Sequence, residues 1–174
     1  MEEDKDKIKI FQKGEDVLRK KAQEVPIDEI TSEKFRNIIK KMEQAIAEDE
    51  DALAVAAPQI GESWQITVIS KWALDPTSEK PKSEFENMVF INPQIINKSK
   101  DTKKFPEGCL SVPGDFGEVE RAEKVKVEAY DENGKKFQRG ASNILAQTLQ
   151  HEIDHLNGIL FVDNFFPKSD VGKR

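Results

Sequence analysis

Apolar residues recur at helical spacing over one stretch near the start of the chain, from about residue 31 to residue 48. Charged residues separate them, and the apolar positions are Phe35, Ile38, Ile39, Met42 and Ile46. Side chains three and four residues apart share one face of an α-helix. The pattern therefore predicts an amphipathic N-terminal helix with one buried stripe.

The middle of the chain has the alternation and the turn signals of β-structure. Residues 64–72 ("WQITVISKW") and 87–97 ("NMVFINPQIIN") predict strands, and the proline-rich, charged stretch 73–86 between them predicts an exposed loop. Residues 54–61 ("AVAAPQIG") are small and apolar and lead into a turn. Residues 124–138 alternate apolar and polar positions on either side of an Asn-Gly pair, which predicts a hairpin.

A second helix is predicted near the end of the chain. Ser142 is a suitable N-cap residue for a helix that runs to Asn157, and Gly158 suits the left-handed position that follows a helix. The order helix, several strands, helix predicts an α+β fold with mostly antiparallel sheet. We expect a single domain over residues 1–174, with a charged tail at 1–7 and a short polar tail at 167–174.

Composition narrows the classes of function. The chain has 174 residues, 37% hydrophobic and 34% charged, and ten phenylalanines can supply a core for one domain. The net charge of -6 is mixed along the chain, so we expect no direct nucleic-acid binding. No apolar run is long enough for a membrane helix, the start does not resemble a signal peptide, and one cysteine permits no internal disulfide. These features predict a cytoplasmic protein without membrane association.

Both histidines of the chain lie four residues apart in "LQHEIDHLNG" (149–158). On a helix, His151 and His155 share a face and can reach one metal ion, while Glu152 beside them can take a proton from water that the ion activates. The alternative is that two ordinary histidines have this spacing by chance. A third ligand would distinguish the two readings.

The usual third ligands of HExxH peptidases are missing downstream. The tenth position after His151 is Phe161, and no glutamate follows Glu152. Upstream, Cys109 in "EGCLSVPG" offers a thiol, and one cysteine with two histidines is a plausible ligand set. Cys109 has two other interpretations, as a small buried apolar residue or as a nucleophile with a histidine base.

Three segments together resemble the peptide deformylase family in order and spacing: "ALAVAAPQ" (52–59), "EGCLS" (107–111) and "QHEIDH" (150–155). The resemblance extends from about Ile8 to Asp163. It implies antiparallel sheets packed around a central C-terminal HExxH helix. It also implies a hydrolase that removes the formyl group from the N-terminal formylmethionine of nascent polypeptides.

The resemblance also implies roles for individual residues. The ligands of one divalent metal ion would be Cys109, His151 and His155. Ferrous iron would be the physiological ion, with zinc, nickel or cobalt able to take its place. Glu152 would act as general base and then as general acid, and the Gln59 side chain and the Leu110 N–H would hold the developing oxyanion.

Further positions of this sequence match the family around that site. Glu107 and Arg121 would pair and brace the cysteine loop. The residues that contact the peptide would be Leu53, Ala54, Gly108 and Thr148. Leu53 and Thr148 would line the pocket for the methionine side chain.

The chain departs from the family pattern near the expected site, in the N-terminal turn at Gly14–Asp16, where "GED" replaces the usual Pro-Asp, and in its C-terminal tail. Ala52 and Ala54 stand where the family has glycine, and alanine at a positive φ would cost about a kilocalorie per mole or more. The tail after Phe166 is also too short for the C-terminal helix with which some members dock on the ribosome, which argues against ribosome association and leaves it an open alternative.

These departures leave two alternative functions. The first is a protein that binds N-terminal peptides but turns them over slowly because of Ala52 and Ala54. The second is a metallopeptidase or deacylase that acts on another amide.

Overall fold

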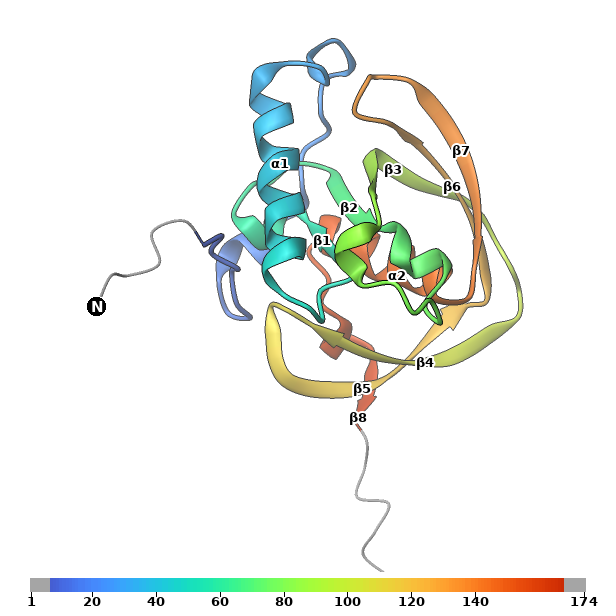
Figure 1. Ribbon diagram of the computed structural model, residues 1–174. Helices are drawn as coiled ribbons and strands as arrows, with labels where there is room; N and C mark the ends of the chain where they lie inside the picture. The colour runs from blue at the N-terminus through green and yellow to red at the C-terminus, as the bar shows by residue number, and fades with distance from the viewer. Residues whose placement is uncertain (1–6, 168–174) are drawn as a thin grey trace, which may run out of the picture.

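The computed structural model describes residues 7–167, which form two α-helices and two antiparallel sheets (Figure 1). The helices are α1 (Glu33–Glu48) and α2 (Asn143–Leu156). The strands are β1 (Ala54–Ala56), β2 (Ile66–Ser70), β3 (Asn87–Lys98), β4 (Thr102–Cys109), β5 (Val112–Ala122), β6 (Lys124–Tyr130), β7 (Lys136–Ser142) and β8 (Phe165–Pro167). This combination confirms the α+β class.

The first sheet has the order β1-β2-β3-β6-β7. The hairpin predicted at residues 124–138 is present, with β6 paired to β7 from Lys124↔Ser142 to Tyr130↔Lys136. Its turn is longer than the two-residue turn that an Asn-Gly pair favours. The Asp131 carboxylate accepts hydrogen bonds from the N–H groups of Asn133 and Lys135, and only Gly134 takes a left-handed φ, of 78°.

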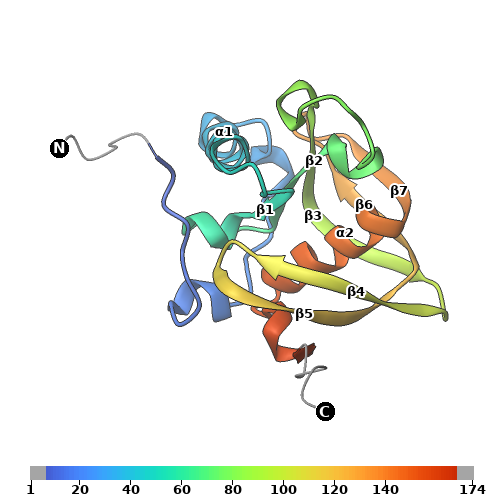
Figure 2. The ribbon, with the colours of Figure 1, turned by 60° about the horizontal axis from the view of Figure 1, so that its bottom comes forward.

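The second sheet has the order β4-β5-β8, and the sequence did not predict it. β4 and β5 form a hairpin that carries Cys109 at the end of β4, and it passes in front of α2 in Figure 2. β8 extends to Pro167, the first residue of the expected polar tail. The rest of this tail, 168–174, and residues 1–6 of the charged N-terminal tail lie outside the described residues.

Each helix packs against a separate part of the core. The predicted stripe of α1 is buried, and it packs against β2 and β3. α2 contacts strands of both sheets, namely β1, β2, β5, β6 and β7. Because α2 is covered on several sides, residues that it carries on one face are held away from bulk solvent.

The two ends of α2 differ from each other in how well the sequence predicted them. Gly158 has a φ of 75°, as expected for a residue after a helix. Ser142 occupies the N-cap position but makes no capping hydrogen bond through its side chain, so that prediction was wrong. The chain enters the helix through Asn143 at a φ of 52°, which is not the approach of an ordinary N-cap.

The N-terminal segment connects elements that surround α2. Phe11 N–H donates to the Gln59 carbonyl (2.8 Å), and Lys13 N–H donates to the Ser111 carbonyl (2.7 Å). Ala22 N–H donates to the Leu156 carbonyl at the end of α2 (2.8 Å). The segment therefore fastens three separate parts of the chain in one arrangement.

Among residues 7–167, no helix is long and apolar enough to cross a membrane.

Candidate metal centre

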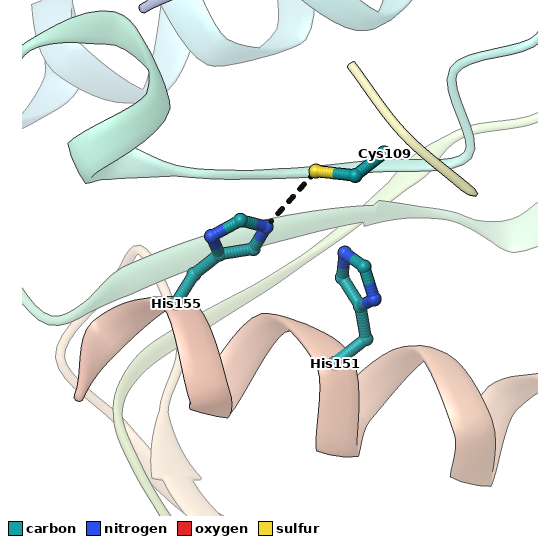
Figure 3. A group of neighbouring side chains, drawn as sticks. All are labelled: Cys109, His151 and His155. Atoms are coloured by element: carbon teal, nitrogen blue, oxygen red, sulfur yellow. Dashed lines mark hydrogen bonds between the residues drawn. The ribbon is translucent and has the colours of Figure 1, made fainter. Parts of the chain in front are cut away.

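The three expected metal ligands come together in space. His151 and His155 project from one face of α2 toward Cys109 of β4 (Figure 3). The Cys109 Sγ lies 3.3 Å from the His155 Nε2, and one donor atom from each of the three residues lies within 4.8 Å of the others. Bonds of about 2.0–2.3 Å to a tetrahedral ion would separate such donors by roughly 3.3–3.7 Å. The residues present fit a metal ion with only small side-chain movements.

Three charged side chains, linked by hydrogen bonds, fix the orientation of His151. The His151 Nδ1 lies 2.8 Å from the Glu107 Oε2, and Arg121 makes a two-pronged contact with the same carboxylate, at 2.8 and 3.0 Å. Arg121 also donates to the Asp154 Oδ2 at 2.5 Å. A carboxylate on Nδ1 fixes the imidazole so that Nε2 is the atom free to bind a metal. The expected pair of Glu107 and Arg121 is therefore present, and it orients a candidate ligand.

Burial and charge set the protonation of these groups. Burial alone would raise the pKa of Glu107, but hydrogen bonds from His151 and Arg121 outweigh it and hold that pKa below its ordinary value. Burial would lower the pKa of His151, but its hydrogen bonds to Cys109 and Glu107 raise it to about 10. Burial lowers the pKa of His155 well below its ordinary value, which leaves the imidazole neutral, the form that binds a metal. A metal ion would have to displace the proton on His151.

Glu152 lies beside the three donors in a buried position. Its side chain is 4% exposed, and its Oε2 has no hydrogen-bond partner among the described residues. Burial raises the pKa of this carboxyl to about 7. A carboxyl group that gains and loses a proton near neutral pH is suited to act as both base and acid.

The Gln59 amide has a fixed orientation next to Cys109. Ala56 N–H donates to the Gln59 Oε1 at 2.9 Å, which leaves Nε2 to face Cys109 Sγ at 3.5 Å and Ser111 Oγ at 3.1 Å. Leu110 follows Cys109, and its carbonyl accepts from the Gln12 side chain at 3.2 Å. The structure therefore places the Gln59 amide N–H groups and the Leu110 backbone on the Cys109 side of the site.

The four residues expected to contact the peptide lie on or next to three elements, β1, β4 and α2. Leu53 and Ala54 pack in the same apolar cluster as Leu149 of α2. Thr148 is about one turn before His151 and about two turns before His155 on their face of α2, and its hydroxyl donates to the Ile144 carbonyl (2.8 Å). Gly108 precedes Cys109, and a Cβ there would lie 2.8 Å from the exposed Phe116 ring.

Alanine is compatible with the backbone at positions 52 and 54. In the described chain only Asn92 and Asn143 among the non-glycine residues have a positive φ, so neither alanine is strained. Ala52 is 2% exposed and Ala54 is 9% exposed, which places both methyl groups inside the protein. The strain considered for these positions is absent.

Three residues of the site region were not singled out from the sequence. Asp154 binds Arg121, Ser111 accepts from Gln59, and Gln150 bonds both the N–H and the carbonyl of Ala122 at 3.0 Å. Asp154 and Gln150 lie within the "QHEIDH" segment, whose polar residues were a usable signal. Ser111 gave no signal, because a serine in a loop has many ordinary roles.

An α+β fold that brings one thiol and two imidazoles beside a buried carboxylate defines a class, that of the metal-dependent hydrolases with an HExxH helix.

Comparison with known proteins identifies the family within this class. A family model described as polypeptide deformylase matches residues 7–170. The chain is 41% identical over 159 residues to a peptide deformylase of Fusobacterium nucleatum, covering 91% of this chain and 84% of that protein. It is 38% identical over 167 residues to the chloroplastic peptide deformylase 1A of Solanum lycopersicum, covering 92% of this chain but only 60% of that protein.

Solved structures agree. A class I type b peptide deformylase from Acinetobacter baumannii matches with a TM-score of 0.80 at 33% identity, covering 91% of this chain and 98% of that one. A peptide deformylase from Synechococcus elongatus, in complex with actinonin, matches with a TM-score of 0.78 at 37% identity, covering 92% and 80%. The chain belongs to the polypeptide deformylase family, whose enzymes depend on a metal ion and remove the N-formyl group from nascent chains.

Proposed function

We propose that this protein hydrolyses the formyl group from N-terminal formylmethionine at a centre built from Cys109, His151, His155 and Glu152. The observation that carries the proposal is the convergence of three metal-type donors within 4.8 Å beside a buried carboxylate oxygen without a partner. Metal ligands alone would suit a structural site. The adjacent carboxylate indicates chemistry instead, because burying one without a partner is costly.

The ligands are Cys109, His151 and His155. A divalent ion bound there would act as a Lewis acid and lower the pKa of a coordinated water. Thiolate and imidazole donors suit several ions, and we propose ferrous iron as the physiological one, with zinc, nickel or cobalt as substitutes. The thiol of Cys109 must stay reduced, which favours a reducing compartment such as the cytoplasm.

Glu152 moves the proton in this mechanism. Its carboxylate takes a proton from the water that attacks the formyl carbon and then delivers it to the departing amine. The pKa of about 7 for the buried carboxyl supports both transfers, since neither protonation state is strongly disfavoured near neutral pH. The products are formate and a peptide with a free N-terminal methionine.

Gln59 and Leu110 stabilise the charge that develops on the formyl oxygen. The Ala56 hydrogen bond fixes the Gln59 amide with its Nε2 facing Cys109, so this donor is oriented before the reaction. One of its two N–H groups exchanges its present acceptor, Cys109 Sγ or Ser111 Oγ, for the formyl oxygen. The Leu110 N–H provides the second donor. Removing one such donor typically lowers kcat by roughly a hundredfold to a thousandfold.

The peptide lies along Leu53, Ala54 and Gly108, with its methionine side chain between Leu53 and Thr148. The Glu107 carboxylate, held by Arg121, supports the site by orienting His151. The substrate is the formylated N-terminus of a nascent polypeptide.

The test is formate release from formyl-Met-Ala by protein purified without oxygen and loaded with ferrous iron. Glu152→Gln keeps the size of the side chain but removes the base, and we expect it to lose nearly all activity. Glu132→Gln, in the exposed turn between β6 and β7, is the matched control and should keep wild-type activity. A folded, metal-loaded wild-type protein that releases no formate would contradict the proposal.

A further inference from the structure

Lys82 makes an unusual set of contacts away from the metal centre. Its half-buried ammonium group donates to four backbone carbonyl oxygens: Ile46 (3.0 Å), Asp49 (2.5 Å), Glu50 (3.2 Å) and Ala52 (2.7 Å). An ammonium group has three N–H donors, so four acceptors use its full capacity and share one donor. A surface lysine seldom gives up this much hydration and side-chain freedom without a role.

The four carbonyls belong to one short stretch of chain. It begins in the last turn of α1, whose carbonyls lack helical partners and favour a cation. It continues through a turn in which Ala52 N–H donates to the Asp49 carbonyl at 3.2 Å. Its last contact, the Ala52 carbonyl, is part of the peptide bond to Leu53. Lys82 therefore closes the end of α1 and holds the chain just before the expected peptide-binding residues.

Leu53 is fastened from its other side by the first sheet. Ser70 N–H donates to the Leu53 carbonyl at 2.9 Å, and Ala54 pairs with Ile69 of β2. On the N-terminal side, the Lys82 side chain donates to the Ala52 carbonyl. Ser70 thus holds one side of Leu53 and Lys82 holds the other.

The segment that carries Lys82 is itself anchored. It runs from η4 (Lys71–Leu74) to η5 (Lys82–Glu84). At its start Ala73 is buried in the apolar cluster that contains Ala54 and Leu149, and Lys71 N–H donates to the Glu86 carbonyl (2.8 Å) across its base. Figure 1 draws this segment in green, and η4 contacts α2. Lys82 therefore links this anchored loop to residues 49–54 and restricts their movement.

We propose that Lys82 is a positioning residue, which fixes residues 49–54 through four backbone carbonyls so that Leu53 and Ala54 are held ready to bind the peptide. This inference rests on the proposed function, because it concerns how the substrate of that site is bound. Lys82 touches neither the metal donors nor Glu152. Its loss should therefore weaken binding of the substrate and of the transition state equally, which raises KM and leaves kcat unchanged.

The test compares Lys82→Met with Lys80→Met, a matched substitution at an exposed lysine of the same loop. We expect Lys82→Met to raise KM for formyl-Met-Ala about fivefold or more, with kcat within about twofold of wild type. We expect no change in either constant for Lys80→Met. Deuterium uptake in Lys82→Met should become faster from the last turn of α1 through residue 56 and in the loop around position 82, and should be unchanged in the rest of the domain.

Two results would overturn the inference. One is an unchanged KM in folded Lys82→Met. The other is a fall in kcat with faster deuterium uptake throughout the domain, because that pattern would mean a general loss of stability. If Lys82→Met does not fold, Lys82→Gln makes the same test. Its shorter amide has two N–H donors in place of three, so KM should rise above the wild-type value, and an unchanged KM would overturn the inference.

Failure of this inference can be told apart from failure of the proposed function. No formate release by the wild type would contradict the proposed function. The deuterium-uptake comparison requires no activity, so it tests the role of Lys82 in either case.

Discussion

Restoring glycine at positions 52 and 54 distinguishes an efficient enzyme from a slow peptide-binding protein. Ala52 and Ala54 have no positive φ and bury their methyl groups, at 2% and 9% exposure. Each glycine would therefore cost about 0.5–1 kcal/mol in backbone entropy and roughly 0.8 kcal/mol in lost methyl burial. The double variant should lose about 2–4 kcal/mol of folding stability, with some coupling between the two neighbouring sites.

The same geometry predicts no gain in turnover from the double variant. Glycine relieves no backbone strain here, and both methyl groups are buried in the core, where they leave little surface to a bound peptide. We expect kcat/KM for formyl-Met-Ala to stay the same or fall. Urea unfolding at fixed metal loading measures the stability, and formate release measures the turnover.

Ala129→Gly is the control for the glycine variants. Ala129 is a strand alanine that is 1% exposed and lies on β6, which β2 and β3 separate from β1 in the first sheet. It should lose a similar stability per site. A rise in kcat of about tenfold or more in the double variant, worth about 1.4 kcal/mol of barrier, would refute the reasoning and favour the slow peptide-binding protein.

Three other perturbations test separate parts of the structure. Gly158→Ala should destabilise by about 2–4 kcal/mol, because its Cβ would lie 2.5 Å from the Arg19 carbonyl oxygen at a φ of 75°; Gly134→Ala, at a φ of 78° with nothing within 4 Å, should cost about 1–2 kcal/mol. Equal losses in urea unfolding would contradict the contact with Arg19. The Arg19 hydrogen bond lowers the pKa of Asp163, so this pair stabilises above the ordinary carboxyl pKa, and its contribution disappears as pH falls through the lower folded pKa. Asp163→Asn should therefore lose up to about 1 kcal/mol at neutral pH and converge with wild type in acid, and a loss independent of pH would argue against the ion pair. Chelation of the metal should lower the thermal midpoint of wild type, since an ion at about a thousandfold above its Kd stabilises by about 4 kcal/mol. Cys109→Ala should respond much less, and an equal response would mean that the cysteine is not a ligand.

The parts of the fold that the sequence predicted have a strong local pattern. The five apolar positions predicted for the buried face of α1 follow the helical period, and the hairpin of β6 and β7 alternates cleanly around its turn. The hairpin of β4 and β5 was missed, because β4 buries only Phe105 and Glu107 and is otherwise polar. A buried glutamate interrupts the apolar pattern by which a strand is recognised, and its partners, Arg121 and His151, lie far away in the sequence.

The parts of the site that the sequence predicted are those in which the type and spacing of the residues determine which groups can bind a metal. Two histidines four residues apart on a helix can reach one ion whatever the rest of the fold, and Cys109 was the available third donor. The hydrogen bonds from Lys82 to four backbone carbonyls could not be predicted, because every residue of any sequence has such a carbonyl. The same holds for the orientation of Gln59, which depends on the N–H of Ala56.

The most direct test of the account is formate release from formyl-Met-Ala while metal-free protein is titrated with ferrous iron in the absence of oxygen. The account predicts activity that rises with added iron and levels off at one ion per chain, with no formate from Glu152→Gln at any loading. Full activity in the metal-free protein, or unchanged activity in Glu152→Gln, would contradict it.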